Sequence, residues 1–111
     1  MNYHGLFKND GAPQIRVALV GVGDFGATLL DQSRNIDKIE IRVICDKDET
    51  CMQNAIRDSG IKPPPMMVTD ITADGLPEFD VLVEATGQPE AAAAIAEWAI
   101  GKGCHVVLSL I

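Results

Sequence analysis

Hydrophobic and polar positions form alternating blocks along the chain, and these blocks predict strands and helices in turn. Short runs rich in β-branched residues are typical of strands. Between them, apolar residues recur every three or four positions, as on Phe25, Leu29 and Leu30, which is typical of helices. The predicted strands cover residues 15–20, 39–45, 66–68, 81–85 and 105–108, with helices after the first, second and fourth. Residues 69–79 lack a clear pattern and predict a loop or short helix.

Strands that alternate with helices at this spacing predict right-handed βαβ crossovers and a parallel sheet. We therefore expect an α/β fold, a Rossmann-type doubly wound parallel sheet of strand order 3-2-1-4-5 in one three-layer domain. This domain should occupy residues 14–111. Residues 1–13 are polar and rich in turn formers, and they predict a tail or arm.

Composition and charge exclude several classes of protein. The 111 residues suffice for one domain, and 47% of them are hydrophobic, so wholesale disorder is excluded. The net charge of −7 makes nucleic acids and anionic membranes poor partners. No apolar run reaches the roughly 18–20 residues of a membrane span. The three cysteines form no C-x-x-C pair, which favours free thiols and a cytoplasmic location.

The segment from Gly21 to Gly26 has the spacing G-x-G-x-x-G, directly after a predicted strand and at the start of a predicted helix. In that context Gly21 permits a tight turn, Gly23 admits a pyrophosphate to the backbone, and Gly26 allows close packing of helix and strand. Phe25 belongs to the same loop and joins the candidate cofactor-binding residues. The alternative is a glycine-rich turn that binds no dinucleotide.

Asp46 ends the second predicted strand, 20 residues after Gly26. An acid at this place accepts hydrogen bonds from the ribose hydroxyls of adenosine and repels a 2′-phosphate, which favours NAD over NADP. The neighbouring Lys47 weakens this preference, since a cation accommodates the extra phosphate. Asp24 lies inside the glycine loop, where it either repels a pyrophosphate or caps the following helix.

Thr86 and Gly87 follow the fourth strand. Ligands of open parallel sheets lie across the carboxyl ends of the strands, so these two residues should lie near the nicotinamide half of a dinucleotide. Alternatively, the Thr86 hydroxyl caps the helix that begins near Pro89. No side chain stands out as a catalytic group or metal ligand: His105 is expected to be a partly buried structural residue, and the cysteines are expected to be packing residues.

Three segments carry a family resemblance: RVALVGVGDFG at residues 16–26, DVLVEATGQPE at 80–90 and GCHVV at 103–107. Together they resemble the N-terminal domain of homoserine-dehydrogenase-like oxidoreductases, especially the subgroup with a C-terminal SAF domain and, more distantly, aspartate dehydrogenases. The resemblance implies NAD(P) binding by the residues named above. It also implies that the catalytic residues of such enzymes lie beyond residue 111. Asp24 departs from the family pattern, which has an uncharged or basic residue there.

The sequence thus predicts the cofactor domain of a longer NAD(P)-dependent oxidoreductase. This domain would position the nicotinamide for hydride transfer, and we expect that it does not catalyse the reaction by itself. Its expected partners are a dinucleotide and a downstream catalytic or effector domain, and assembly into homo-oligomers is left open. One alternative is a ligand- or redox-sensing module of a regulatory protein. Another is a protein-interaction domain with a degenerate glycine loop.

Overall fold

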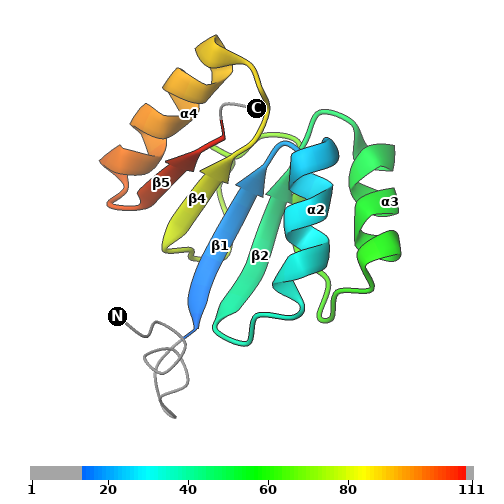
Figure 1. The fold of residues 1–111 in the computed structure, drawn as a ribbon. Helices are drawn as coiled ribbons and strands as arrows, with labels where there is room; N and C mark the ends of the chain where they lie inside the picture. The colour runs from blue at the N-terminus through cyan, green and yellow to red at the C-terminus, as the bar shows by residue number, and fades with distance from the viewer. Residues whose placement is uncertain (1–13, 110–111) are drawn as a thin grey trace.

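A computed structural model describes residues 14–109, which form a five-stranded parallel sheet with helices on both faces (Figure 1). The strand order is β3-β2-β1-β4-β5, so the predicted fold class and strand order are confirmed. In chain order the elements are β1 (Ile15–Val20), α2 (Asp24–Ser33), β2 (Ile39–Cys45), α3 (Glu49–Ser59), β3 (Met66–Val68), β4 (Val81–Glu84), α4 (Pro89–Gly101) and β5 (His105–Leu108).

Each face of the sheet carries its own apolar core, because successive strand residues point to opposite faces. On one face, the buried cluster joins the sheet to α2 through Leu30 and to α3 through Met52. On the other face, Ala18 and Leu82 belong to a cluster with Ala99 of α4. The molecule therefore has the three predicted layers, with α2 and α3 on one face and α4 on the other.

Local signals fix the ends of the helices. The Asp48 side chain accepts a hydrogen bond from the Cys51 N–H at 3.1 Å, which caps the start of α3. Gly60 ends the same helix in the left-handed conformation, with φ +67°. Pro89 begins α4, where a missing N–H is tolerated.

Residues 69–79 contain neither a helix nor a strand, which confirms the loop among the two structures predicted for them. His105 is exposed on β5, and the prediction of partial burial is wrong because its side chain lies on the face opposite to the one where Val106 packs in the cluster with α4. The predicted tail, residues 1–13, lies outside the described part of the chain. Within residues 14–109, the helices are too short or too polar to cross a bilayer.

Candidate cofactor-binding site

The glycine loop joins β1 to α2 at the carboxyl edge of the sheet. Gly21 has φ +92°, and a Cβ atom there would lie 2.7–2.8 Å from backbone atoms of Ala85 and Thr86. A Cβ atom on Gly26 would collide with the carbonyl oxygen of Gly21. Both glycines are therefore required by the close packing of the loop, as the motif predicts.

Gly23 differs from these two glycines, since an added Cβ would meet no atom within 4 Å. The residue is exposed and has φ −78°, so any amino acid fits its backbone. The space beside Gly23 is therefore open for a group outside the protein.

The first turn of α2 offers unpaired donors next to this space. Gly23 is the N-cap residue and has no side-chain capping bond. Within residues 14–109, the N–H groups of Asp24, Phe25 and Gly26 have no hydrogen-bond acceptor, and the first bond of the helix runs from the Ala27 N–H to the Gly23 carbonyl at 2.8 Å. Free N–H groups and the positive end of the helix dipole make this turn suitable for an anion.

Asp24 does not cap α2, so that alternative is wrong. It is the first residue of the helix and exposed, and its carboxylate accepts no hydrogen bond within the described residues. The negative charge of Asp24 therefore lies near the free N–H groups, but the carboxylate accepts no hydrogen bond from them. Phe25 is 42% exposed and does not share the buried helix face to which Leu30 belongs.

Asp46 connects the end of β2 to the glycine loop. Its Oδ2 accepts a hydrogen bond from the Val22 N–H at 2.8 Å, and its Oδ1 accepts one from the Asp48 N–H at 3.0 Å. A carboxylate has about four acceptor positions, so about two remain for a ligand hydroxyl. The geometry thus fits the predicted role of Asp46 and adds a second one, which is to hold the loop.

The turn between β4 and α4 forms the opposite wall. Glu84 Oε1 accepts hydrogen bonds from the N–H and the hydroxyl of Thr86, both at 2.9 Å. The Thr86 hydroxyl accepts a bond from the Gln88 N–H at 3.2 Å. Gln88, not Thr86, is the N-cap residue of α4, so the Thr86 hydroxyl stabilises the turn instead of the first helical turn.

These segments enclose a cleft of about 490 Å³ at the carboxyl edge of the sheet. Five of the predicted site residues line it: Gly21, Gly23, Asp46, Lys47 and Thr86. Gly26 lies behind the loop, while Phe25 and Gly87 are not among the lining residues.

Sequence reasoning missed part of the lining of the cleft. Asp70, Ile71 and Thr72 follow β3, and the shared carboxyl edge of parallel strands is the signal that could have placed them there. Ala91 and Ile95 add an apolar wall from α4, four residues apart on one helix face. The cleft therefore has polar groups at the glycine loop and apolar side chains along α4.

The thiols next to the cleft are poor nucleophiles. Burial, with the nearby charges of Asp70 and Asp46, raises the pKa of the Cys45 thiol to about 11. Burial also raises the pKa of Cys51, whose Sγ donates to the Val22 carbonyl at 3.1 Å. Both thiols are therefore protonated at neutral pH. No cluster suited to a metal ion occurs within residues 14–109.

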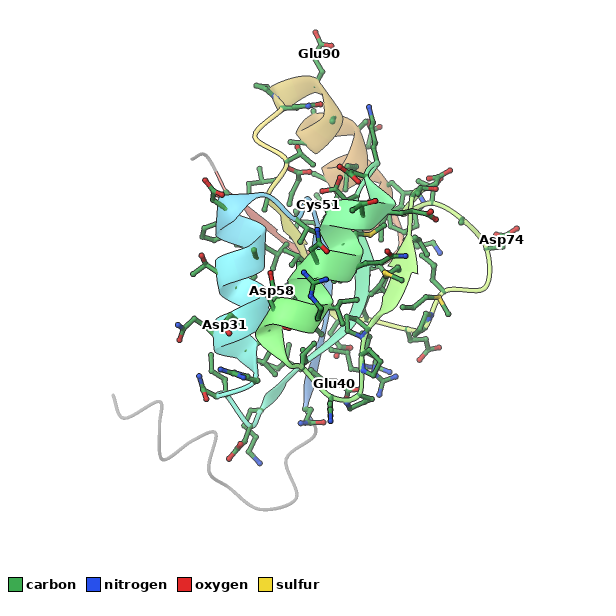
Figure 2. All side chains as sticks on the ribbon, turned by 90° about the vertical axis from the view of Figure 1, so that its right-hand side faces the viewer. Asp31, Glu40, Cys51, Asp58, Asp74 and Glu90 are labelled. Carbon is green, nitrogen blue, oxygen red and sulfur yellow. The ribbon has the colours of Figure 1, made fainter. Side chains whose placement is uncertain are left out.

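Negative charge is spread over the surface and does not gather at the cleft alone. Figure 2 shows Asp31, Asp58, Asp74 and Glu90 on α2, α3, the loop after β3 and α4. The same view places Cys51 on α3. This distribution agrees with a solvated acidic surface.

Solved structures share this fold. An oxidoreductase from Agrobacterium radiobacter, in complex with NAD⁺, L-tartaric acid and magnesium, superposes with TM-score 0.71 at 23% identity, over 86% of this chain and 27% of that one. A dehydrogenase from Chromobacterium violaceum superposes with TM-score 0.71 at 26% identity, over 87% of this chain and 28% of that one. The WlbA dehydrogenase from Bordetella pertussis, in complex with NADH and UDP-GlcNAcA, superposes with TM-score 0.63 at 30% identity. This match covers 86% of this chain and 28% of that one.

The chain therefore spans little more than a quarter of the length of these structures. No curated protein sequence matches it. A family model described as the NAD-binding domain of homoserine dehydrogenase matches residues 21–109, which include the glycine loop, Asp46 and the β4–α4 turn. The chain thus belongs to the family of homoserine dehydrogenase NAD-binding domains, and its cofactor is NAD.

Proposed function

We propose that this chain positions NAD for hydride transfer in a homoserine-dehydrogenase-like oxidoreductase whose substrate is bound by another domain. The observation that carries the proposal is the open backbone at Gly23, with the free N–H groups of α2 beside it. When bound, NAD supplies the hydride acceptor or donor, and the protein supplies its position and electrostatic surroundings. The share of the compared structures that this chain covers supports a substrate domain elsewhere in the enzyme.

In this proposal, the pyrophosphate lies against Gly23 and accepts hydrogen bonds from the first turn of α2. Gly21 and Gly26 act indirectly, because they allow the loop to pack closely enough to form the site. Phe25 contributes its free N–H group, while its exposed ring lies outside the lining of the cleft.

Asp46 binds the adenosine ribose through its remaining acceptor positions and disfavours a 2′-phosphate. Lys47, which lines the same cleft, reduces but does not reverse this preference, so NADP is the weaker ligand. Thr86 and Gly87 lie at the nicotinamide end. The apolar wall of Ile71, Ala91 and Ile95 supplies a surface for the adenine ring.

Calorimetric titration of the chain with NAD⁺, NADH, NADP⁺ and NADPH tests the proposal. We expect the non-phosphorylated pair to bind more tightly than the phosphorylated pair. Gly23→Val should abolish binding, since its side chain fills the space for the pyrophosphate and its Cβ meets no protein atom within 4 Å. Gly101→Val is the matched control, because Gly101 also has open space around it but lies at the far end of α4.

Unchanged affinity in Gly23→Val, with the control behaving like the wild type, would refute the assignment of the glycine loop. Tighter binding of NADP⁺ than NAD⁺ would refute the role given to Asp46. None of the compared structures favours the regulatory alternative, since all three are described as oxidoreductases or dehydrogenases.

A further inference from the structure

Glu84 places a carboxyl group in the apolar interior of the sheet. It is the last residue of β4 and only 1% exposed, and it pairs with Val20 of β1 and Leu108 of β5. Burial of a polar group without partners is unfavourable. The hydrogen-bond partners of the Glu84 carboxyl group therefore indicate which segment it stabilises.

Those bonds go to a single residue. Both hydrogen bonds that Glu84 accepts through its side chain come from Thr86, and both reach Oε1. Oε2 is buried and has no partner within the described residues. Among residues 14–109, the β4–α4 turn thus supplies the side-chain hydrogen bonds that hold the carboxyl group, and the carboxyl group holds that turn in return.

The Thr86 hydroxyl extends this connection. It donates to Glu84 Oε1 and accepts from the Gln88 N–H, so its proton is directed towards the sheet. Thr86 and Gln88 both line the cleft, and the backbone of Thr86 packs against Gly21. Any shift of this turn therefore changes the distance between the two walls of the cleft.

We infer that Glu84 is a positioning residue of the cofactor site, which acts through Thr86 to hold the β4–α4 turn in place for the nicotinamide half of NAD. This inference rests on the proposed function. Glu84 itself does not line the cleft, so its effect on binding is transmitted by the turn.

A comparison of NAD⁺ with ADP-ribose tests the inference, because ADP-ribose keeps the adenosine, the pyrophosphate and the second ribose but lacks nicotinamide. Calorimetry on the 111-residue chain gives both affinities for the wild type and for Thr86→Val, Thr86→Ser, Glu84→Met and Glu84→Gln. Thr86→Ser keeps the hydroxyl, and Glu84→Gln keeps an acceptor oxygen. At similar volume, Thr86→Val removes the hydroxyl with its bonds to Glu84 and Gln88 but keeps the N–H bond to Oε1, whereas Glu84→Met removes the acceptor of both bonds from Thr86.

We expect Thr86→Val and Glu84→Met to weaken NAD⁺ binding about tenfold, as expected for a lost hydrogen bond, while ADP-ribose binding changes by less than about twofold. The serine and glutamine variants should behave like the wild type. Thr86 is part of a surface turn, so its valine variant tests the inference even if Glu84→Met fails to fold.

An equal loss for both ligands, or no loss for either, would overturn the positioning role while leaving NAD binding intact. Equal wild-type affinity for NAD⁺ and ADP-ribose would overturn it too, since the turn then contributes nothing to the nicotinamide half. Binding of neither ligand by the wild type would overturn the proposed function and this inference together.

Discussion

Alanine at Gly21 and alanine at Gly23 should affect different properties of this protein: the first should lower its stability, and the second should lower its affinity for NAD⁺. Gly21 has φ +92°, a conformation that costs an L-residue about 1–2 kcal/mol. The new Cβ would also lie 2.7–2.8 Å from three backbone atoms of Ala85 and Thr86 in the β4–α4 turn, and overpacking of this kind costs about 1–3 kcal/mol. We therefore expect Gly21→Ala to lower the free energy of unfolding by about 2–5 kcal/mol.

Gly23→Ala meets neither penalty, because its backbone is unstrained and no atom lies within 4 Å of the new Cβ. The loss of glycine at the N-cap should cost no more than about 1 kcal/mol. The variant should nevertheless lose affinity for NAD⁺, since the methyl group occupies the space assigned to the pyrophosphate.

Urea denaturation followed by the fluorescence of Trp98 measures the stabilities. Trp98 is the single tryptophan and packs near Phe79, with ring centroids 6.3 Å apart, so its environment changes on unfolding. The midpoint should fall strongly for Gly21→Ala and little for Gly23→Ala at unchanged m-value. Equal stability of the two variants would refute the close packing of the glycine loop against the β4–α4 turn.

Four further predictions concern charge and thiol chemistry. Hydrogen bonds from Arg16 lower the pKa of Asp80 to about 2, so the stability this ion pair contributes is present above pH ~4, the ordinary range of an aspartate, and is lost as the pH falls towards 2. Asp80→Asn should reduce the fall of the urea unfolding midpoint between pH ~4 and pH ~2, and an unchanged fall would contradict this pairing. Cys45 should resist a thiol reagent at pH 8 until the chain unfolds, because burial raises its pKa to about 11, and rapid labelling of the folded chain would contradict that burial. Asp24→Asn should tighten NAD⁺ binding about twofold to tenfold in low-salt calorimetry, since it removes a negative charge beside the pyrophosphate; weaker binding would show that the carboxylate supports the loop. Asp46→Asn should raise the NADP⁺-to-NAD⁺ affinity ratio about tenfold, and a constant ratio would remove Asp46 from cofactor selection.

The sequence predicted the parts of this molecule that depend on local pattern. The parallel sheet follows from alternating strands and helices, and the glycine loop follows from spacing between a strand and a helix. Asp46 could be placed because the end of β2 must lie beside the loop in this topology. Each of these conclusions uses neighbours along the chain and a general rule for parallel sheets.

The parts that depend on contacts between distant segments were not predictable in the same way. Nothing in the sequence shows that the Asp24 carboxylate fails to cap its helix or that Phe25 turns away from the core. The position of the loop containing Ile71 is set by tertiary packing, because that segment has no regular periodicity. The bonds of Glu84 to Thr86 become visible only when the turn is seen in three dimensions.

We expect NAD to bind at the glycine loop and the β4–α4 turn. Titration of ¹⁵N-labelled chain with NAD⁺, followed by amide chemical shifts, locates the ligand on the molecule. The largest shifts should occur at the amides of Gly23, Asp24, Phe25 and Thr86, with little change in the loop of residues 73–79. Saturable binding whose largest shifts lie in that loop or along β5, with the glycine loop unaffected, would contradict this binding site.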